Sequence, residues 1–187
     1  MDGPMSSPNK RGGVAMMGRT HAAVGMASCL LALDAGAVAH GGILADASLV
    51  LAGVIGALLP DLDHPKSTAG SMLPFVSVPL SAMFGHRGAT HSLLAAGLCF
   101  ALGTAAAQAV PSIHSLPAFA LGLAIGWLSH LAADMLNPAG APLLWPHPRR
   151  FRFPLPSSPN GLLDSLLFWA SAICSVVLIV RHSAPSI

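Results

Sequence analysis

The stretch "ILADASLVLAGVIGALLPDLDHPKS", Ile43 to Ser67, joins a long apolar run to a cluster of charge. The apolar part, Ile43–Leu59, is long enough to cross a bilayer, which needs about 20 residues within a working range of roughly 17 to 25. Pro60 then ends or kinks the helix, which leaves the carboxylates of Asp61 and Asp63 on a loop. The stretch therefore predicts a membrane-spanning helix that ends in groups suited to chemistry.

The whole chain has the composition of an integral membrane protein. Charged residues make up 9% of its 187 residues, against about 25% in an average soluble domain, and its mean hydropathy is +0.68. Such a chain has too few charges to cover a soluble surface, and its net charge of +2 is too small to indicate nucleic-acid binding. Cys29, Cys99 and Cys174 each lie alone in apolar runs, so neither a thiolate metal site nor a disulfide framework is expected.

We predict an all-α polytopic membrane bundle of about five spanning helices plus one re-entrant or interfacial segment. The predicted spans are Ala22–Ala39, Ile43–Leu59, Ser92–Val110, Pro117–Leu136 and Leu162–Val180. A sixth run, Ser71–Phe84, is shorter and contains two prolines, so we expect it to return to its own side. A signal peptide is the competing interpretation of the first run, and Asp34 inside that run argues against it.

The bundle is predicted to form one domain, residues 18–182, between a flexible N-terminal tail, 1–17, and a short C-terminal tail, 183–187. Positive charge falls mainly on one side of it, and cytoplasmic loops of membrane proteins carry an excess of Lys and Arg. With five crossings and the N-terminus in the cytoplasm, the cytoplasmic residues are Lys10, Arg11, Arg19, Lys66, Arg87, Arg149, Arg150 and Arg152, and only Arg181 lies outside. This bias predicts an N-terminus inside and a C-terminus outside.

The same topology brings His and Asp side chains from four span ends to the cytoplasmic side. The first span opens with His21, the second closes with Asp61, Asp63 and His64, the third follows "GHRGATHS" with His86, Arg87 and His91, and the fourth closes with His130 and Asp134. Ionisable groups within a membrane usually mark a functional site. We therefore expect one site at this end, with Thr90 a candidate cap for the helix that follows it.

The residue types at this end favour a divalent metal. His130 and Asp134 are four residues apart on a predicted helix, so they share a face and can bind one ion together. Histidine and carboxylate without thiolate suit zinc in a catalytic site, or manganese, and the number of candidate ligands allows one or two ions. The histidines predicted on the other side, His40, His114 and His182, are interpreted as packing residues.

The loop Asn137–Pro159 interleaves arginines with aromatic residues in "LLWPHPRRFRFPLP". One interpretation is an interfacial anchor, with the aromatic rings among the headgroups and the arginines on anionic lipid. The other is a cationic wall for a phosphate-bearing substrate. Both remain open, and they are compatible.

Four motifs carry a resemblance to a known family. "GRTH", "LLPDLDHPKS", "GHRGATHS" and "GWLSHLAADMLNPAG" resemble the LexA-regulated or LexA-binding, inner-membrane, metal-dependent hydrolases, over roughly Gly18 to Phe153. The order of His and Asp is more distantly similar to zinc-dependent phospholipase C and P1 nuclease. That pattern implies first metal ligands at His21, Asp61, His91, His130 and Asp134, with Asp134 bridging two ions. The chain contains no Glu, so Asp63, His64 and His86 would complete a second ion or orient these ligands.

The resemblance implies a multi-pass protein of the bacterial inner membrane that hydrolyses a phosphoester of a lipid or other amphipathic substrate. A bound ion would activate water, Asp61 or Asp63 would accept its proton, and Arg87 would stabilise charge on the phosphoryl oxygens. The alternatives are a metal-ion transporter or metal-sensing membrane protein, and a scaffold with a structural metal. A transporter should place its ligands near the bilayer midplane, whereas these ligands are predicted at span ends.

Overall fold

The chain forms helices in the order in which its apolar runs occur. The computed structural model describes residues 16–85, 87–153, 155 and 161–183, so most of the predicted tails lie outside it. Within these residues there are seven α-helices, two 3-10 turns and no strand. In chain order they are α1 (Gly18–Asp34), α2 (Ile43–Gly56), η1 (Leu59–Asp63), α3 (Thr68–Met72), α4 (Pro74–Phe84), η2 (Ala89–His91), α5 (Leu93–Ala109), α6 (Leu116–Met135) and α7 (Leu162–Ser183).

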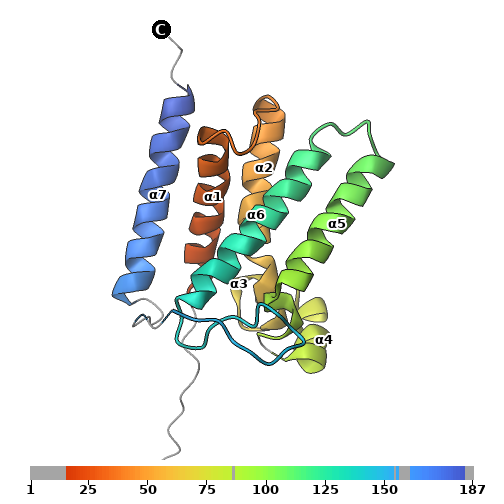
Figure 1. Cartoon of the computed structure of the whole chain (residues 1–187), viewed down its shortest axis with the longest axis vertical. Coiled ribbons are helices and arrows are strands. Elements are labelled where there is room, and N and C mark those ends of the chain that lie inside the picture. Colours follow the sequence, from red (N-terminus) through yellow and green to blue (C-terminus); the bar gives the residue numbers. More distant parts are fainter. Residues whose placement is uncertain (1–15, 86, 154, 156–160, 184–187) are drawn as a thin grey trace, which may run out of the picture.

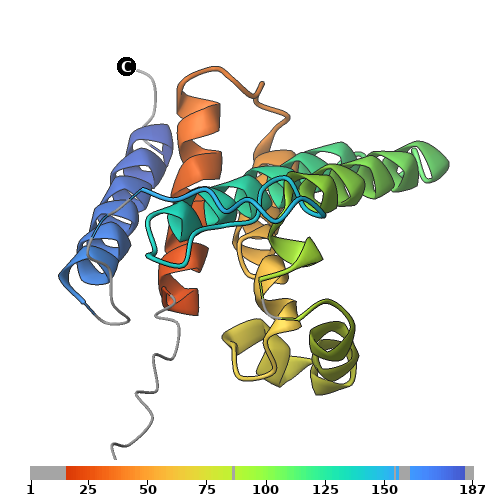
Figure 2. The same ribbon diagram turned by 60° about the horizontal axis from the view of Figure 1, so that its bottom comes forward.

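Helices α7, α1 and α2 stand side by side, α6 runs obliquely across α1 and α2, and α5 packs against α6 (Figure 1). Helix α1 packs against α2, α6 and α7, and α6 packs against α2 and α5. The short helices α3 and α4 lie beyond one end of these helices (Figure 2), where they contact η1. We call this the site end, because η1, η2 and the loop that follows α6 also lie there.

Small residues allow α2 and α6 to pack closely. A Cβ added at Gly126 of α6 would lie 2.0 Å from the carbonyl oxygen of Gly53, and one added at Gly122 would lie 2.2 Å from that of Leu49. On the α2 side, a Cβ at Gly56 would lie 2.2 Å from the carbonyl oxygen of Leu123. Small residues at such positions are typical of helix contacts in membranes, where lipid supplies no hydrophobic drive for association. This contact sets the position of the last turns of α6 beside the end of α2.

The described residues contain three helices that are long and apolar enough to cross a membrane. They are Ile43–Asp63, which joins α2 to η1, and the helices Leu116–Met135 and Leu162–Ser183, with 21, 20 and 22 residues. We predicted five. The other two predicted spans correspond to α1 and α5, which have 17 residues each. Helix α1 is short because it ends at Asp34, ahead of a turn in which Gly36 takes a φ of 68°.

Two local predictions were tested by the backbone. The run Ser71–Phe84, predicted not to cross, contains the end of α3 and the 11-residue helix α4, which lies at the site end. Thr90 was a candidate cap for the third span, and this was wrong. The cap of α5 is Ser92, whose hydroxyl accepts a hydrogen bond from the backbone N–H of Ala95 at 3.2 Å.

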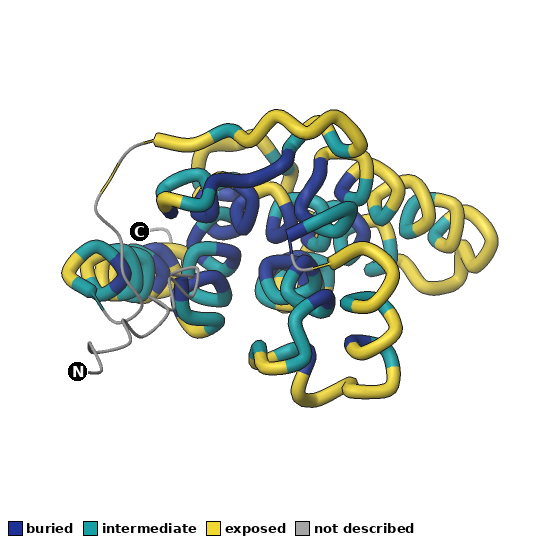
Figure 3. Tube along the Cα trace, turned by 90° about the horizontal axis from the view of Figure 1, so that it is seen from below, coloured by how far each residue is buried: buried dark blue, intermediate teal, exposed yellow. Residues whose placement is uncertain are grey.

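Burial follows the arrangement of the helices. Seen from the site end, buried residues gather where α1, α2 and α6 meet, and much of α5 and α7 is exposed (Figure 3). The exposed side chains of α7 are large and apolar, and they include Leu162, Trp169, Ile173, Val176 and Val180. An exposed apolar surface of this size marks a membrane contact or a protein interface. The buried polar groups, by contrast, concentrate at the site end.

Candidate metal centre

Five of the seven predicted metal ligands meet at the site end, and each element of the bundle core contributes to the group. The residues are His21 from α1, Asp61 from η1, His91 from η2, and His130 and Asp134 from α6. We call them the His/Asp cluster. The three imidazoles and Asp134 are at most 1% exposed. Asp61 is the partly accessible member, with its side chain 17% exposed.

Four candidate ligand atoms of the cluster lie close together: the Nε2 atoms of His91 and His130, each within 4 Å of a carboxylate oxygen of Asp61 and of Asp134. The Nε2 atoms of His91 and His130 lie 3.2 Å apart. Nε2 of His91 lies 3.6 Å from Oδ1 of Asp61 and 3.5 Å from Oδ2 of Asp134. Nε2 of His130 lies 3.9 Å from Oδ1 of Asp61 and 3.8 Å from Oδ2 of Asp134. Zinc ligands at about 2.0–2.2 Å from an ion form a tetrahedron with edges of about 3.3–3.6 Å. The two imidazoles with either carboxylate therefore have spacings of 3.2–3.9 Å, close to those of three ligands around one divalent ion.

Both of these imidazoles are held through Nδ1, which turns Nε2 towards the cluster. Nδ1 of His130 lies 2.7 Å from the carbonyl oxygen of Ala57, which can only accept, so this nitrogen carries the proton. Nδ1 of His91 lies 3.2 Å from Oδ2 of Asp63. Histidines that bind metal usually donate their other N–H to a carbonyl or carboxylate, which fixes the ring and its tautomer. The pair has this arrangement on both sides.

Asp63 lies on the Nδ1 side of His91, and the Nε2 of that ring faces the other ligand atoms. Its Oδ2 accepts hydrogen bonds from the backbone N–H of Arg87 at 3.0 Å and from the hydroxyl of Thr90 at 2.5 Å. The carboxylate is fully buried. These contacts fit the orienting role that was one of the predictions for Asp63, rather than the alternative role of proton acceptor. Thr90 was missed as part of this network. Thr90 directly precedes His91 in the sequence, and this adjacency is the signal that could have pointed to its contact with Asp63.

The carboxylate of Asp134 is divided between two environments. Its Oδ1 accepts from the guanidinium Nη2 of Arg87 at 3.0 Å and from the side-chain amide of Asn137 at 2.7 Å. Its Oδ2 is buried and has no hydrogen-bond partner among the described residues. A buried oxygen without a partner costs about 1–3 kcal/mol, and a cation between Oδ2 and the two imidazoles would satisfy it. Asn137 was not predicted, although it follows Asp134 by three residues.

His21 stacks on the ring of His130, with centroids 3.9 Å apart and planes inclined by 22°. Its Nε2 lies 3.8 Å from Oδ1 of Asp134, and its buried Nδ1 has no hydrogen-bond partner within the described part of the chain. His21, His130 and Asp134 form a second group with ligand spacing. Because Nδ1 of His130 bonds to Ala57, its Nε2 has one lone pair for one ion. A second ion would therefore have to share Asp134.

The charge of the cluster favours protonation of His91 when no ion is bound. Burial lowers the pKa of this imidazole, but its contacts with the carboxylates of Asp61 and Asp63 outweigh burial, and the pKa rises to about 9. A metal ligand must be deprotonated at the binding nitrogen. An ion that binds here therefore replaces a proton between His91 and the carboxylates.

Arg87 adds a buried cation to one side of the cluster. Its backbone has a φ of 60°, a left-handed conformation that residues other than glycine rarely adopt. This conformation accompanies the hydrogen bond from its N–H to Asp63 and the ion pair of its side chain with Asp134. The guanidinium is 7% exposed, and its Nη1 has no hydrogen-bond partner among the described residues. A buried donor is thus available beside the ligands.

Of the other two predicted ligands, only His64 is among the described residues. His64 follows η1, is half-buried, and belongs to neither group of residues with ligand spacing. His86 lies outside the described residues.

The chain matches one protein family over almost the whole of its described length. The family is described as "YdjM inner membrane protein", and the match covers residues 16–185. The chain belongs to this family. Together with the three long apolar helices, membership supports its placement in an inner membrane.

Relatives of the chain are known from several bacteria. The inner membrane protein YdjM of Escherichia coli is 51% identical over 139 residues, which are 73% of this chain and 68% of the relative. The protein YvsG of Bacillus subtilis, named as uncharacterized, is 32% identical over 160 residues, 86% of this chain and 92% of the relative. No solved structure matches the chain. None of these names states an activity, so phospholipase-like hydrolysis and metal dependence stay predictions for this YdjM-family member.

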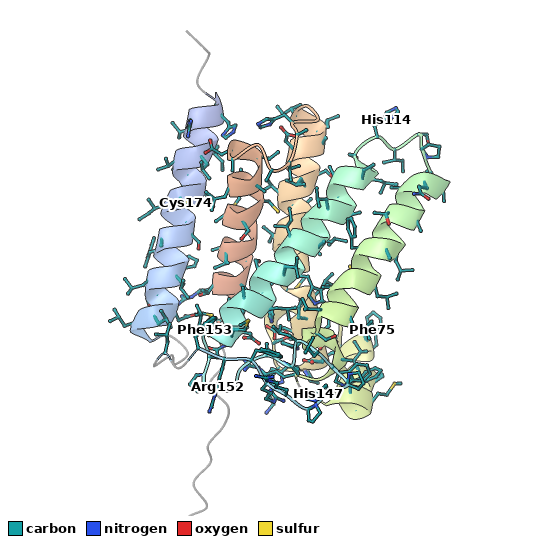
Figure 4. The ribbon with its side chains drawn as sticks, in the orientation of Figure 1. Phe75, His114, His147, Arg152, Phe153 and Cys174 are labelled. Atoms are coloured by element: carbon teal, nitrogen blue, oxygen red, sulfur yellow. The ribbon has the colours of Figure 1, made fainter. Side chains whose placement is uncertain are left out.

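The arginine-rich loop of this family member also lies at the site end. Arg150 reaches the carbonyl oxygen of Arg87 at 3.5 Å, and Arg152 reaches that of Pro138 at 3.2 Å. Residues Ala141 and Phe151 pair through two backbone hydrogen bonds of 2.9 Å, which fold the loop back on itself. Figure 4 shows His147, Arg152 and Phe153 at this end of the molecule. Both interpretations of the loop, lipid anchor and cationic wall, fit this position.

Proposed function

We propose that the chain is a membrane-embedded, metal-dependent hydrolase that cleaves a phosphoester of a lipid or another amphipathic substrate at the cytoplasmic face. One observation carries the proposal: a buried His/Asp cluster with ligand spacing contains a carboxylate oxygen of Asp134 and, beside it, a guanidinium nitrogen of Arg87 that have no hydrogen-bond partner among the described residues. A purely structural ion would not require the second feature.

The residues that would hold the ion are His91, His130 and Asp134, with His21 beside Asp134, and three protein ligands leave a position for water. Asp61 lies within 4 Å of the same two imidazoles. Zinc suits two imidazoles with carboxylates, and manganese is the second choice. When bound, such an ion lowers the pKa of a water ligand towards about 7 and polarises a phosphoryl oxygen.

Asp61 is the group best placed to accept a proton in this proposal. Its side chain is partly exposed, whereas that of Asp134 is 2% exposed and already accepts from Arg87. Asp63 is engaged by Arg87, Thr90 and His91, so it holds the ring of His91 in place.

Arg87 would bind the phosphoryl group. Its Nη2 is held by Asp134, and its Nη1 has no hydrogen-bond partner among the described residues. Guanidinium donors pair well with phosphate oxygens and stabilise the charge that grows on them during displacement. The arginines of the loop at residues 149–152 lie at the same end and would attract an anionic headgroup.

The proposed topology has five crossings, with α1 and α5 as short spans beside the three longer ones, the N-terminus in the cytoplasm and the C-terminus outside. Two observations support it. The five helices run alternately from the site end to the opposite end and back (Figure 1). Arg19, Lys66, Arg87 and the arginine-rich loop all belong to segments at the site end, as positive-inside charge requires.

Metal analysis of the purified protein, followed by a panel of phosphoesters and phospholipids, tests the function. We expect bound zinc or manganese in the wild type and hydrolysis that Asp134→Ala abolishes. A preparation that holds no divalent ion, or one that transports the ion into proteoliposomes without hydrolysing any member of the panel, would overturn the proposal.

A further inference from the structure

Two histidines at the end of the bundle opposite the His/Asp cluster face a cavity. His40 lies in the turn between α1 and α2, and His182 lies in the last turn of α7. With Asp46, they line a cavity of about 570 Å³ whose other walls are mainly apolar side chains of α1, α2 and α7. Their ring centroids lie 5.3 Å apart, with the planes inclined by 49°. The sequence analysis interpreted both histidines as packing residues.

Each of these imidazoles is held through Nδ1. That of His40 lies 2.7 Å from Oδ2 of Asp46, and that of His182 lies 2.8 Å from the carbonyl oxygen of Leu178. The carbonyl can only accept, and the carboxylate is an acceptor when ionised, so both Nδ1 atoms carry the proton. Both Nε2 atoms then have a free lone pair.

The same arrangement occurs at the His/Asp cluster. There too, one imidazole is held by a carboxylate and the other by a backbone carbonyl, as the contacts of His91 with Asp63 and of His130 with Ala57 show. The centroids of His91 and His130 are 5.1 Å apart, close to the 5.3 Å of the opposite pair. Two imidazoles that bind one tetrahedral ion through Nε2 have centroids about 5 Å apart, given metal–nitrogen bonds of about 2.0–2.1 Å. The opposite pair therefore matches the pair in the His/Asp cluster in the distance between its rings and in the groups that hold each Nδ1.

The surrounding groups fix the two histidines in position. Oδ1 of Asp46 accepts from the backbone N–H of Gly41 at 3.0 Å, so the carboxylate that holds His40 is itself held. Next to His182, Arg181 forms an ion pair with Asp34 at 3.1 Å, which joins the end of α7 to the end of α1. The carboxylate that holds His40 and the helix end that carries His182 are thus each held by a further contact.

We propose that His40 and His182 bind a second divalent transition-metal ion at this end of the bundle. Imidazole nitrogens suit Zn²⁺, Cu²⁺ and Ni²⁺. The side chain of His40 is 50% exposed, so water reaches the site and completes the coordination. The ion joins α7 to the turn before α2, two segments otherwise connected here through α1. This inference does not depend on the proposed hydrolase activity.

Equilibrium dialysis of the purified full-length protein against Zn²⁺ tests the site. We expect His40→Ala and His182→Ala each to bind about one equivalent less than the wild type. The matched control is His114→Ala, because His114 is exposed at the same end of the molecule but does not line the cavity (Figure 4). His114→Ala should bind as much zinc as the wild type.

Two outcomes overturn the proposal: wild-type zinc binding in His40→Ala and His182→Ala, or an equal loss in His114→Ala. A second measurement does not need the variants to fold. Wild-type protein whose His/Asp cluster is filled with zinc is titrated with Cu²⁺ and followed by electron paramagnetic resonance. We expect hyperfine coupling to two imidazole nitrogens, and a copper spectrum without nitrogen coupling would contradict the site.

Discussion

Arg87 and Asp134 form a buried ion pair, in which Nη2 lies 3.0 Å from Oδ1. One terminal atom of each group is left over: Nη1 of Arg87 and Oδ2 of Asp134 have no hydrogen-bond partner among the described residues. A buried ion pair that served stability alone would have its remaining atoms satisfied. The two unpartnered atoms indicate ligands of opposite charge: a cation beside Asp134 and an anion beside Arg87.

Replacing Asp134 by Asn should remove the bound metal. The substitution keeps the shape of the side chain and its room beside Asn137, but it removes the anionic oxygen that lies 3.5 Å from Nε2 of His91. We expect the metal content to fall to background, and the chelator-sensitive part of the thermal stability to disappear with it. Elemental analysis and thermal unfolding with and without chelator measure the two effects.

The control for this change is Asp164→Asn. Asp164 is also fully buried, but it lies in the first turn of α7, where it accepts from the backbone N–H of Met17 at 3.3 Å. It belongs to neither group of residues with ligand spacing. If Asp164→Asn loses the metal as completely as Asp134→Asn, the loss reports damage to the fold and the assignment of Asp134 is wrong.

Asp63→Asn should weaken metal binding without abolishing it. Asp63 supports His91 through Nδ1 and does not face the four ligand atoms, and loss of such a support typically lowers metal affinity about 10–100-fold. Asp61→Asn removes the negative charge of an oxygen that faces both imidazoles and should lower the affinity further. Competition with a chromophoric chelator measures both. Equal affinities in the two variants would show that the structure assigns their roles wrongly.

Arg87→Gln should separate metal binding from hydrolysis. Arg87 is not a ligand, so the variant should keep its metal, while hydrolysis of the active phosphoester falls about 10²–10³-fold because the transition-state charge loses a donor. Arg181→Gln is the control, since Arg181 pairs with Asp34 at the opposite end of the molecule, and it should retain most of the activity. An Arg87→Gln enzyme with unchanged turnover would remove Arg87 from the mechanism.

The sequence was sufficient to predict that these residues lie at one end of the bundle, because the end at which each residue lies depends on the order of the helices. Alternate crossings return every second span end to one side, so His21, Asp61, His91 and the pair on α6 had to share that side if the spans were right. Their meeting at one end in the structure confirms that part of the prediction. Helix lengths were predicted less well, because the turn at Gly36 shortens α1 in a way that hydropathy does not report.

The supports of the cluster could not be predicted, because they depend on how segments pack. The carbonyl of Ala57 is positioned by the contact between α2 and α6, and the bond from Thr90 to Asp63 joins two loops. The pairing of His40 with His182 joins the α1–α2 turn to the far end of the chain. The sequence around an isolated histidine does not show which distant residue it will contact. A pair on one helix, such as His130 and Asp134, can be predicted from its spacing.

The close contact between α2 and α6 should control both stability and metal affinity. In Gly126→Ala the new Cβ would lie 2.0 Å from the carbonyl oxygen of Gly53 and 2.8 Å from the backbone nitrogen of Ala57, so the two helices must move apart. Overpacking of this kind costs about 1–3 kcal/mol. Movement of Ala57 also loosens the carbonyl that holds Nδ1 of His130.

We therefore expect Gly126→Ala to unfold at a lower temperature in detergent and to bind metal more weakly than the wild type. Gly97→Ala is the control, because a Cβ at Gly97 of α5 meets nothing within 4 Å. In the helix interior, that exchange should leave stability unchanged or raise it by up to about 1 kcal/mol, with metal affinity as in the wild type. If Gly126→Ala lowered the unfolding temperature but left metal affinity intact, the carbonyl of Ala57 would not be what positions His130.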